Sequence, residues 1–336
     1  MKVLFVTNLY PTKNNPDYGV FTKDQIQSTL ENGVTGDVLF INARENGIRE
    51  YFKALKRIND AYKDYDLIHC FHGLSLIVTF LATKNKPILI SFLLAIKYES
   101  LHKNYIINKI YSLTYNTIIK SKRVFSIFKD ELPEHLFSNG RSFYLPNGVD
   151  LSEFFPINRE AACKALSLDP NKTYVLFVSS KDKFRLVKRY DLFSKTIQIL
   201  KDNSKTLNID ELVLSNVPRD QCIYYFNVAS VHLLTSDYEG SPNSVKEAMS
   251  CNTPVVSTDV GNVKQMFNGA SNCFISPQDP AIFAEYVLKA IIEPPCDLRN
   301  VLIENKLTVQ DKTNELVDIY RKIIEKQVNI KKQQYN

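Results

Sequence analysis

The feature that most constrains the fold is an alternation, along the whole chain, of short apolar runs with longer helix-like segments. The runs, rich in Val, Ile, Leu and Phe, are Lys2–Thr7, Asp37–Asn42, Asp66–Cys70, Pro87–Phe92, Arg123–Ile127, Tyr174–Ser179, Leu212–Ser215, Ser230–Thr235, Pro254–Thr258 and Asn272–Ile275. Helical candidates include Phe21–Glu31, Ile48–Tyr62, Arg189–Leu200, Ala281–Ile292, Asp297–Asn305 and Val309–Gln327. Apolar strands interleaved with helices are typical of βαβ units around buried parallel sheets. The pattern therefore predicts an α/β fold.

The length of the chain, 336 residues, favours two domains, because one hydrophobic core usually stops growing below this size. In the segment YLPNGVDLSEFFP, over Tyr144–Pro156, two prolines bracket an Asn-Gly turn, which suits a connector. We therefore expect two open, doubly wound domains, 1–150 and 151–310, followed by a helix and tail over 311–336. In such sheets ligands bind beyond the carboxyl ends of the strands, and a cleft between two domains is the expected site.

Charge and cysteine content narrow the class of protein. The net charge of +6 fits an anionic substrate or weak attraction to acidic lipid, and it gives no argument for nucleic acid. The six cysteines show no C-x-x-C spacing, which favours reduced thiols over a disulfide framework or a zinc site. The N-terminus MKVLFVTNLY is typical of a first strand rather than a secretion signal, and no apolar run approaches the ~20 residues that span a bilayer. We expect a cytoplasmic protein.

The stretch SDYEGSPNSVKEAM places two glutamates, Glu239 and Glu247, eight positions apart around a turn. One interpretation is structural: Ser244 and Glu247 match the S-x-x-E capping box of a helix. The other is a ligand site, because a helix beginning near Ser244 offers N–H groups to a diphosphate, and Gly240 permits close approach of a ligand to the backbone. Carboxylates on either side of the loop would accept hydrogen bonds from sugar hydroxyls. Glu247 can serve both purposes.

This stretch resembles the E-x7-E motif of retaining glycosyltransferases of the GT-B fold, in particular glycosyltransferase family 4. The resemblance extends to VTNLYPTKNNPDYGVF, YLPNGVDLSEFFP, NVPRDQCIYYFNVASVHLLTSDYEG and CNTPVVSTDVGNVKQMF, which span most of the chain in the expected order. It implies two Rossmann-like domains facing across a cleft, with the acceptor on the first and a nucleotide-sugar donor on the second. It also implies a C-terminal helix that returns to the N-terminal domain.

The resemblance assigns roles to particular residues. Glu247 would bind the ribose, Glu239 would contact the donor sugar near the reacting centre, and Lys188 would neutralise the donor diphosphate, where fixed cations stabilise the charge of the leaving group. The remaining donor-binding candidates are Gly240, Ser241, Pro242, Asn243 and Ser244 in the loop, and Gly19 in DYGVF, which a plain turn also explains. The arginine that accompanies the lysine in the family stays open among Lys181, Lys183 and Arg185.

Two features of the first half depart from the family or remain ambiguous. Where the family often has a His-Gly-x-Asp-like turn, this chain has ISFLLAIKYE, which puts first-domain contacts in doubt or provides an apolar loop for a lipid-like acceptor. The segment Lys97–Arg123 is basic and amphipathic, and it fits a membrane surface and a solvated helix equally.

The metal-like motifs of the first half have simpler explanations. His69 and His72 form H-x-x-H, which we interpret as core or cleft histidines, with His72 a candidate for the acceptor side. Asp64-Tyr65-Asp66 is interpreted as a solvated turn rather than a metal motif. We expect no metal and no cofactor.

The function that the resemblance implies is retaining transfer of a sugar from a UDP- or GDP-sugar to a hydroxyl of a glycan or lipid-linked acceptor, in surface polysaccharide biosynthesis. The expected partners are that donor, that acceptor and a peripheral membrane contact, without nucleic acid. Two alternatives stay open: a non-catalytic nucleotide-sugar-binding or partner subunit, and a sugar-nucleotide epimerase.

Overall fold

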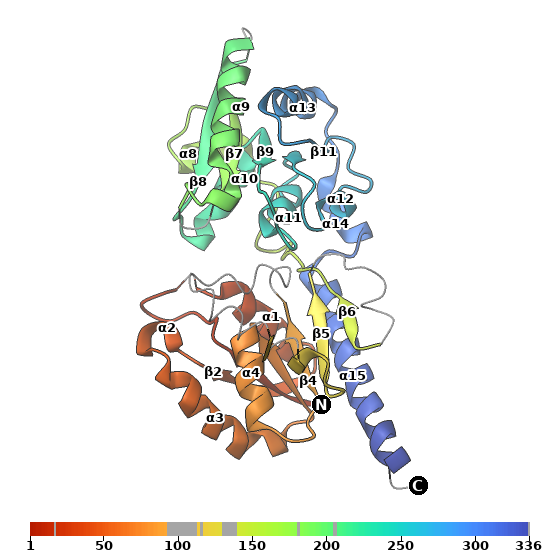
Figure 1. Ribbon diagram of the computed structural model, residues 1–336. Coiled ribbons are helices and arrows are strands. Elements are labelled where there is room, and N and C mark those ends of the chain that lie inside the picture. The colour runs from red at the N-terminus through yellow and green to blue at the C-terminus, as the bar shows by residue number, and fades with distance from the viewer. Residues whose placement is uncertain are drawn as a thin grey trace. The chain divides into compact units, whose positions relative to one another are not determined.

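The chain forms two compact units, Met1–Pro146 together with Lys312–Asn336, and Asn147–Asp311 (Figure 1). The computed structural model describes residues 1–334 except 17, 93–112, 115–116, 130–139, 180–181 and 204–206, and of residues 328–334 it describes only the backbone. The predicted features at Leu93, Leu94 and Ile96, at Lys181, and over most of Lys97–Arg123 lie outside the described residues.

The first unit is built on a sheet with the strand order β2-β1-β3-β4-β5-β6 among its described residues. Every pair of neighbouring strands is parallel. The strands are β1 (Lys2–Thr7), β2 (Thr35–Phe40), β3 (Leu67–Phe71), β4 (Ile88–Ser91), β5 (Val124–Phe128) and β6 (Ser142–Tyr144). The helices are α1 (Val20–Glu31), α2 (Ala43–Asn46), α3 (Arg49–Ala61), the short η1 (Tyr62–Asp64), α4 (Gly73–Ala82) and α15 (Val309–Gln334).

Alternate residues of these strands build two separate cores, one on each face of the sheet. Val6 and Ile68 pack on one face with residues of α3 and α4 such as Ile58. Phe5 and Phe125 pack on the other face with residues of α1 and α15. Because successive side chains of a strand point to opposite faces, an uninterrupted apolar run such as VLFV supplies both cores at once.

The second unit has a smaller sheet with the order β11-β10-β9-β7-β8, again parallel at every described pairing. Its strands are β7 (Thr173–Val178), β8 (Ile209–Leu214), β9 (Val231–Leu234), β10 (Val255–Ser257) and β11 (Phe274–Ile275). Its helical elements are α8 (Arg159–Ala165), η2 (Leu186–Lys188), α9 (Tyr190–Asn203), η3 (Arg219–Gln221), α10 (Cys222–Val228), α11 (Asn243–Ser250), α12 (Val263–Met266), α13 (Pro280–Ile292) and α14 (Leu298–Glu304).

Helices cover both faces of this second sheet as well. Helices α9 and α13 pack on one face, through residues such as Phe193 and Phe283 (Figure 1). Residues of α8, α10, α11, α12 and α14 form the core of the opposite face around Leu176 and Leu234. The predicted fold class, two doubly wound Rossmann-like domains, is therefore confirmed for each unit.

The C-terminal helix α15 packs on the first unit, as predicted. Its residues Leu316, Tyr320 and Ile323 are buried in the same core as Phe5 and Phe125. The Tyr320 hydroxyl lies 2.6 Å from Nδ1 of the buried His69, whose Nε2 lies 2.8 Å from Oγ of Ser91. Within the described part of the chain no helix is both long and apolar enough to cross a membrane.

Candidate functional site

Strand β9 ends at Leu234, earlier than the predicted strand end at Thr235, and a buried polar segment follows it. Thr235 and Ser236 are fully buried, and the chain then emerges at the exposed Asp237. We call Thr235–Glu239 the acidic loop. Because it follows the carboxyl end of a central strand of a parallel sheet, it lies at the edge where such folds bind ligands.

Lys188 and Glu239 form an ion pair in this loop region. Nζ of Lys188 lies 2.6 Å from Oε1 of Glu239, and the two side chains are only 15% and 17% exposed. Oγ of Ser236 donates a second hydrogen bond to the same carboxylate oxygen, at 2.8 Å. The structure thus brings together a cation and a carboxylate that lie 51 residues apart in sequence, with the second oxygen of Glu239 remaining as an acceptor.

The turn that carries Lys188, Leu186–Arg189, is tied to the acidic loop by its backbone; we call it the lysine turn. The N–H of Asp237 donates to the carbonyl of Val187 at 2.9 Å. The Thr235 hydroxyl donates to the carbonyls of Lys188 at 2.8 Å and Arg189 at 3.1 Å. The position of Lys188 relative to Glu239 is therefore set by backbone contacts as well as by their own ion pair.

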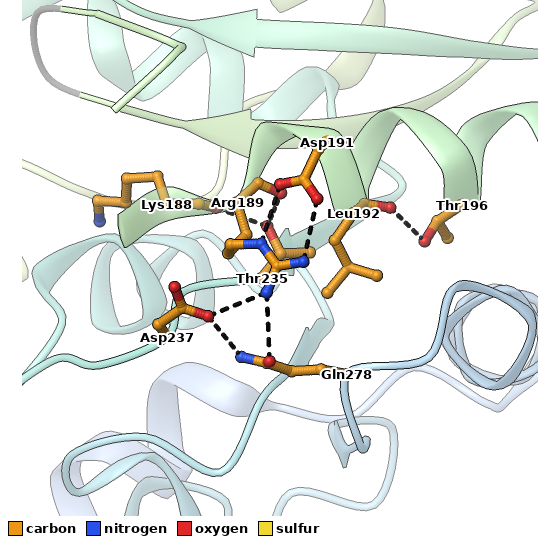
Figure 2. Close-up of polar contacts among 8 residues, drawn as sticks. All are labelled: Lys188, Arg189, Asp191, Leu192, Thr196, Thr235, Asp237 and Gln278. Carbon is orange, nitrogen blue, oxygen red and sulfur yellow. Dashed lines mark hydrogen bonds and ion pairs between the residues drawn. The ribbon is translucent and has the colours of Figure 1, made fainter. Parts of the chain in front are cut away.

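Arg189, which the sequence analysis did not single out, extends this connection through its side chain (Figure 2). Its guanidinium binds both carboxylate oxygens of Asp191, at 2.9 and 3.0 Å, and it also donates to Asp237 at 3.1 Å. Gln278 lies 3.4 Å from the guanidinium and donates to Asp237 at 3.0 Å. The hydrogen bonds that Arg189 donates to Asp191 and Asp237 raise the pKa of Arg189, and the bond to Asp191 lowers the pKa of that carboxyl.

The other basic candidates lie differently. The ammonium of Lys183 lies over the ring of Tyr190, 4.7 Å from its centroid, and 3.5 Å from the Tyr190 hydroxyl. Arg185 is exposed, and its carbonyl accepts the N–H of Lys188 at 2.8 Å. Of these predicted cations it is Lys188 that reaches Glu239.

The predicted capping box at the start of α11 is wrong. The helix begins one residue earlier than expected, at Asn243, with Pro242 at the cap position and no side-chain cap. Nε2 of His232 lies 3.1 Å from the Ser244 hydroxyl, while Glu247 forms an ion pair elsewhere. Both residues are used in tertiary contacts, so within the described part of the chain neither they nor Pro242 cap the first turn with a side chain.

His232 explains how Ser244 is held. Nδ1 of this buried histidine lies 3.0 Å from the Leu176 carbonyl, which can only accept, so Nδ1 carries the proton. Burial lowers the pKa of His232 to about 4, so the ring is neutral and Nε2 accepts from the Ser244 hydroxyl. The hydroxyl proton of Ser244 therefore points into the protein, and its oxygen keeps acceptor capacity.

Glu247 is buried in α11 and is bound by Arg219, another residue that the sequence analysis missed. Nη1 of Arg219 lies 2.6 Å from Oε1 of Glu247, and the same guanidinium binds both oxygens of Glu153, at 2.7 and 3.1 Å. The central carbon of the Arg219 guanidinium, Cζ, lies 4.5 Å from the centre of the Phe154 ring. Burial opposes the charge of Arg219, but Glu247 and Glu153 together keep its pKa above the usual value.

The loop between the two glutamates is held from inside the unit. Lys246 is fully buried, and its ammonium donates to Oγ of Ser241 at 2.7 Å and to the Ser241 carbonyl at 3.3 Å. The side-chain amide of Asn147 donates to Oδ1 of Asn243 at 3.4 Å. The N–H of Asn262 donates to the Gly240 carbonyl at 3.2 Å. Gly240, Ser241 and Pro242 are all buried, so this part of the loop is fixed rather than solvated.

Gly261 is a steric requirement of this loop, and this yields a prediction. Its φ is +54°, and a Cβ there would lie 2.1 Å from the carbonyl oxygen of Gly240. Gly261→Ala should therefore lower the stability of the second unit by roughly 2–4 kcal/mol, from backbone strain and a clash with backbone. The loss is measured as a fall in the denaturant midpoint.

Gly269→Ala is the matched control for Gly261→Ala. Gly269 also has a positive φ, +91°, but the nearest atom to its added Cβ lies 3.8 Å away. The variant Gly269→Ala should lose only about 1–2 kcal/mol of unfolding free energy, from backbone strain alone. Equal losses for the two variants would contradict the clash with Gly240.

Three predicted residues lie in the first unit. Gly19 precedes α1 with a φ of +77°, and a Cβ there would lie 2.3 Å from the Leu9 carbonyl carbon, so the turn requires glycine whether or not a ligand approaches. His69 is a core residue. His72 follows β3 with the unusual φ of 88°, and its Nδ1 accepts the N–H of Leu74 at 3.2 Å. Among the described residues no group of His, Cys, Asp and Glu could hold a metal ion.

Comparison with known proteins shows which class of protein has this fold and this motif. Residues 200–308, which include both glutamates, match the family model "Glycosyl transferases group 1". Solved structures with the same fold include sucrose-phosphate synthase from Thermosynechococcus elongatus, with a TM-score of 0.66 and 14% identity over 100% of this chain and 99% of that one. Anabaena HepE in complex with UDP and glucose matches with a TM-score of 0.64 and 14% identity over 95% and 98%. The chain therefore has the GT-B fold and carries a group 1 glycosyltransferase domain in its second unit.

Among curated proteins, the chain is similar to TuaC, the glycosyltransferase assigned to teichuronic acid biosynthesis in Bacillus subtilis (strain 168). The two are 23% identical over 86% of this chain and 89% of TuaC. A D-inositol 3-phosphate glycosyltransferase of Thermobifida fusca (strain YX) is 25% identical over 44% of this chain and 41% of that protein.

Proposed function

We propose that the protein is a retaining glycosyltransferase that moves a sugar from a UDP- or GDP-sugar to a hydroxyl of a glycan or lipid-linked acceptor. The observation that carries the proposal is the Lys188–Glu239 pair at the carboxyl edge of β9, next to a helix whose first turn has no side-chain cap. A cation, an acceptor carboxylate and N–H donors suit a diphosphate joined to a sugar.

In this proposal different residues of the second unit bind different parts of the nucleotide-sugar donor. Lys188 and the N–H groups of the first turn of α11 bind the diphosphate, and Gly240, Ser241, Pro242, Asn243 and Ser244 line its path. Glu239 accepts hydrogen bonds from sugar hydroxyls and Glu247 from the ribose. One oxygen of each carboxylate is already bound, to Lys188 and Arg219 respectively, so each presents its other oxygen to the ligand.

In this proposal the site catalyses the reaction by stabilising the negative charge that develops on the leaving diphosphate. As the bond between the anomeric carbon and the diphosphate breaks, its electrons pass to the diphosphate, and a fixed ammonium stabilises that charge. The acceptor oxygen attacks the same face of the sugar, and its proton passes to the departing phosphate oxygen. The anomeric configuration is thereby retained, and the proposal includes no divalent metal.

We place the acceptor on the side of the first unit, with His72 as a contact. Its Nδ1 is occupied as an acceptor by the N–H of Leu74, so in the neutral ring Nε2 carries the proton and is a donor. Burial lowers the pKa of His72, which favours this neutral form. Similarity to TuaC supports an acceptor that belongs to a surface polysaccharide.

Donor binding is tested by the melting temperature in the presence of a panel of UDP- and GDP-sugars. A true donor should raise the melting temperature, by an amount corresponding to about 2.7 kcal/mol at a concentration one hundred times the dissociation constant. The donor found is then incubated with membrane extract, and release of UDP or GDP is measured with and without the extract. NMR of the product should show the anomeric configuration of the donor.

Other outcomes of these binding and release experiments would point to a different function. Stabilisation by no nucleotide-sugar would contradict the proposal, and binding without acceptor-dependent release would indicate a non-catalytic binding protein. Conversion of the donor to an epimer without any acceptor would indicate an epimerase. A product of inverted configuration would contradict only the retaining mechanism.

A further inference from the structure

We infer that Arg189 is a positioning residue, whose side chain locks the lysine turn onto the acidic loop and so aims Lys188 at the donor diphosphate. This inference rests on the proposed role of Lys188. Arg189 acts through its neighbour and does not itself touch the ligand.

The backbone of Arg189 shows that the lysine turn is constrained. Arg189 adopts the left-handed conformation, with φ 52° and ψ 51°, where the chain passes from η2 into α9. A residue with a Cβ is disfavoured in this conformation, and glycine is the usual occupant. An arginine here therefore requires compensating contacts from the surrounding structure.

The side chain supplies those contacts from three segments of the second unit. Figure 2 shows the guanidinium between Asp191 in the first turn of α9, Asp237 in the acidic loop and Gln278 before α13. The contact with Asp191 is a two-point fork, at 2.9 and 3.0 Å, and the contact with Asp237 is a single bond at 3.1 Å. Such bidentate contacts fix direction as well as distance.

Asp237 transmits this constraint to Lys188. Its carboxylate is held by Arg189 and Gln278, while its backbone N–H donates to Val187, the residue before Lys188. The lysine turn is thus fastened to the acidic loop on both sides of Lys188. Any shift of the turn relative to Glu239 must break the Arg189–Asp237 bond or the Asp237–Val187 bond.

The same geometry argues against Arg189 as a direct phosphate ligand. All three nitrogens of its guanidinium already donate to Asp191, Asp237 or Gln278, within the part of the chain that the structure describes. An incoming phosphate could bind Nε or Nη1 only by displacing Asp191, Asp237 or Gln278, so among the described contacts it would find only the second hydrogen of Nη2 and no two-point grip. The exposed fraction of the side chain, 32%, is about twice that of Lys188, so burial does not force these contacts.

The test measures binding of UDP, GDP, UMP and GMP by isothermal titration calorimetry to four variants. These are Arg189→Gly, Lys188→Met, their combination, and the control Lys201→Met. Lys201 lies in α9, the helix that follows Arg189, and its substitution removes an ion pair to Asp210 in β8. Glycine keeps the left-handed backbone available, so Arg189→Gly should fold with a melting temperature near that of the parent. It removes only the side-chain contacts.

We expect Lys188→Met to weaken binding of the preferred nucleoside diphosphate about tenfold and Arg189→Gly about fivefold, with the monophosphate changed less than twofold in both. In the Lys188→Met background Arg189→Gly should add nothing, because Arg189 acts through Lys188. Lys201→Met should bind as the parent does.

Two outcomes would overturn the inference while leaving the proposed function intact. Full diphosphate affinity in Arg189→Gly would show that the side chain positions nothing. Losses that add in the double variant, or that affect mono- and diphosphate equally, would show that Arg189 acts on something other than Lys188. By contrast, an unchanged diphosphate affinity in Lys188→Met would overturn the proposed role of Lys188 and the role of Arg189 with it.

Discussion

Replacing Glu239 with glutamine is expected to lower kcat for sugar transfer by roughly 10²–10³, the effect seen when one electrostatic contact to a transition state is removed. The amide keeps the shape of the side chain but removes the negative charge that faces Lys188 at 2.6 Å. It also turns one of two acceptor atoms into a donor. Lys188 then loses its charged partner, and the sugar hydroxyls lose the carboxylate that orients them.

The measurement is steady-state release of the nucleoside diphosphate at saturating acceptor, with kcat and the donor KM determined separately. Because the proposed contacts strengthen as the leaving group departs, kcat should fall far more than KM rises. Asp210→Asn is the matched control, since Asp210 also pairs with lysines, Lys172 and Lys201, and is part of β8. A kcat of Glu239→Gln within threefold of the parent would contradict the assigned role.

The fold was predictable from sequence because the central strands of each sheet are buried on both faces. An apolar run such as Lys2–Thr7 can be recognised as a strand from its own residues alone, and β1 has the predicted bounds. Two short elements were missed for the opposite reason. Strand β6 has three half-buried residues, and α8 has seven residues, so neither carries enough of a periodic pattern to be recognised.

The candidate site was predictable only where one local segment carried the signal. Glu239 and Glu247 stand in a single stretch, and Lys188 is placed by resemblance. Their partners are not readable in this way: Arg219 reaches Glu247 from 28 residues away, and Arg189 meets Asp237 across 48 residues. The false capping box has the same cause, because Ser244 and Glu247 are drawn to His232 and Arg219 by contacts that local spacing does not encode.

The first unit contains a buried charge that the proposed chemistry does not use. Lys129 follows β5 and is 2% exposed. Burial, with a smaller contribution from Lys312, lowers its pKa to about 7, while Glu315 acts in the opposite direction. Lys129 also acts on His69, whose pKa is held well below its usual value by its own burial and, to a lesser extent, by Lys129. A charged Lys129 in this position destabilises the folded state.

Lys129→Met should therefore raise the free energy of unfolding, by roughly 3–5 kcal/mol at pH 7, since each unit of pKa shift corresponds to about 1.4 kcal/mol. Between pH 7 and the unfolded pKa near 10.5, the unfolded chain binds the additional proton, so the contribution of Lys129 to the stability of the parent becomes less unfavourable as pH rises across that window. The advantage of the variant should thus be fully present below pH 7 and should shrink by more than half by pH 9.5.

Urea unfolding at pH 7 and pH 9.5 measures this difference. The titration of buried cysteines, whose pKa burial raises from an ordinary value inside this window, affects variant and parent alike and cancels in the difference. Lys322→Met, at an exposed position of α15, is the control and should change stability by less than about 0.5 kcal/mol at either pH. A constant gap between Lys129→Met and the parent would mean that the gain comes from packing of the methionine and not from removal of a charge. A variant no more stable than the parent at pH 7 would mean that the ammonium of Lys129 is compensated in the folded protein.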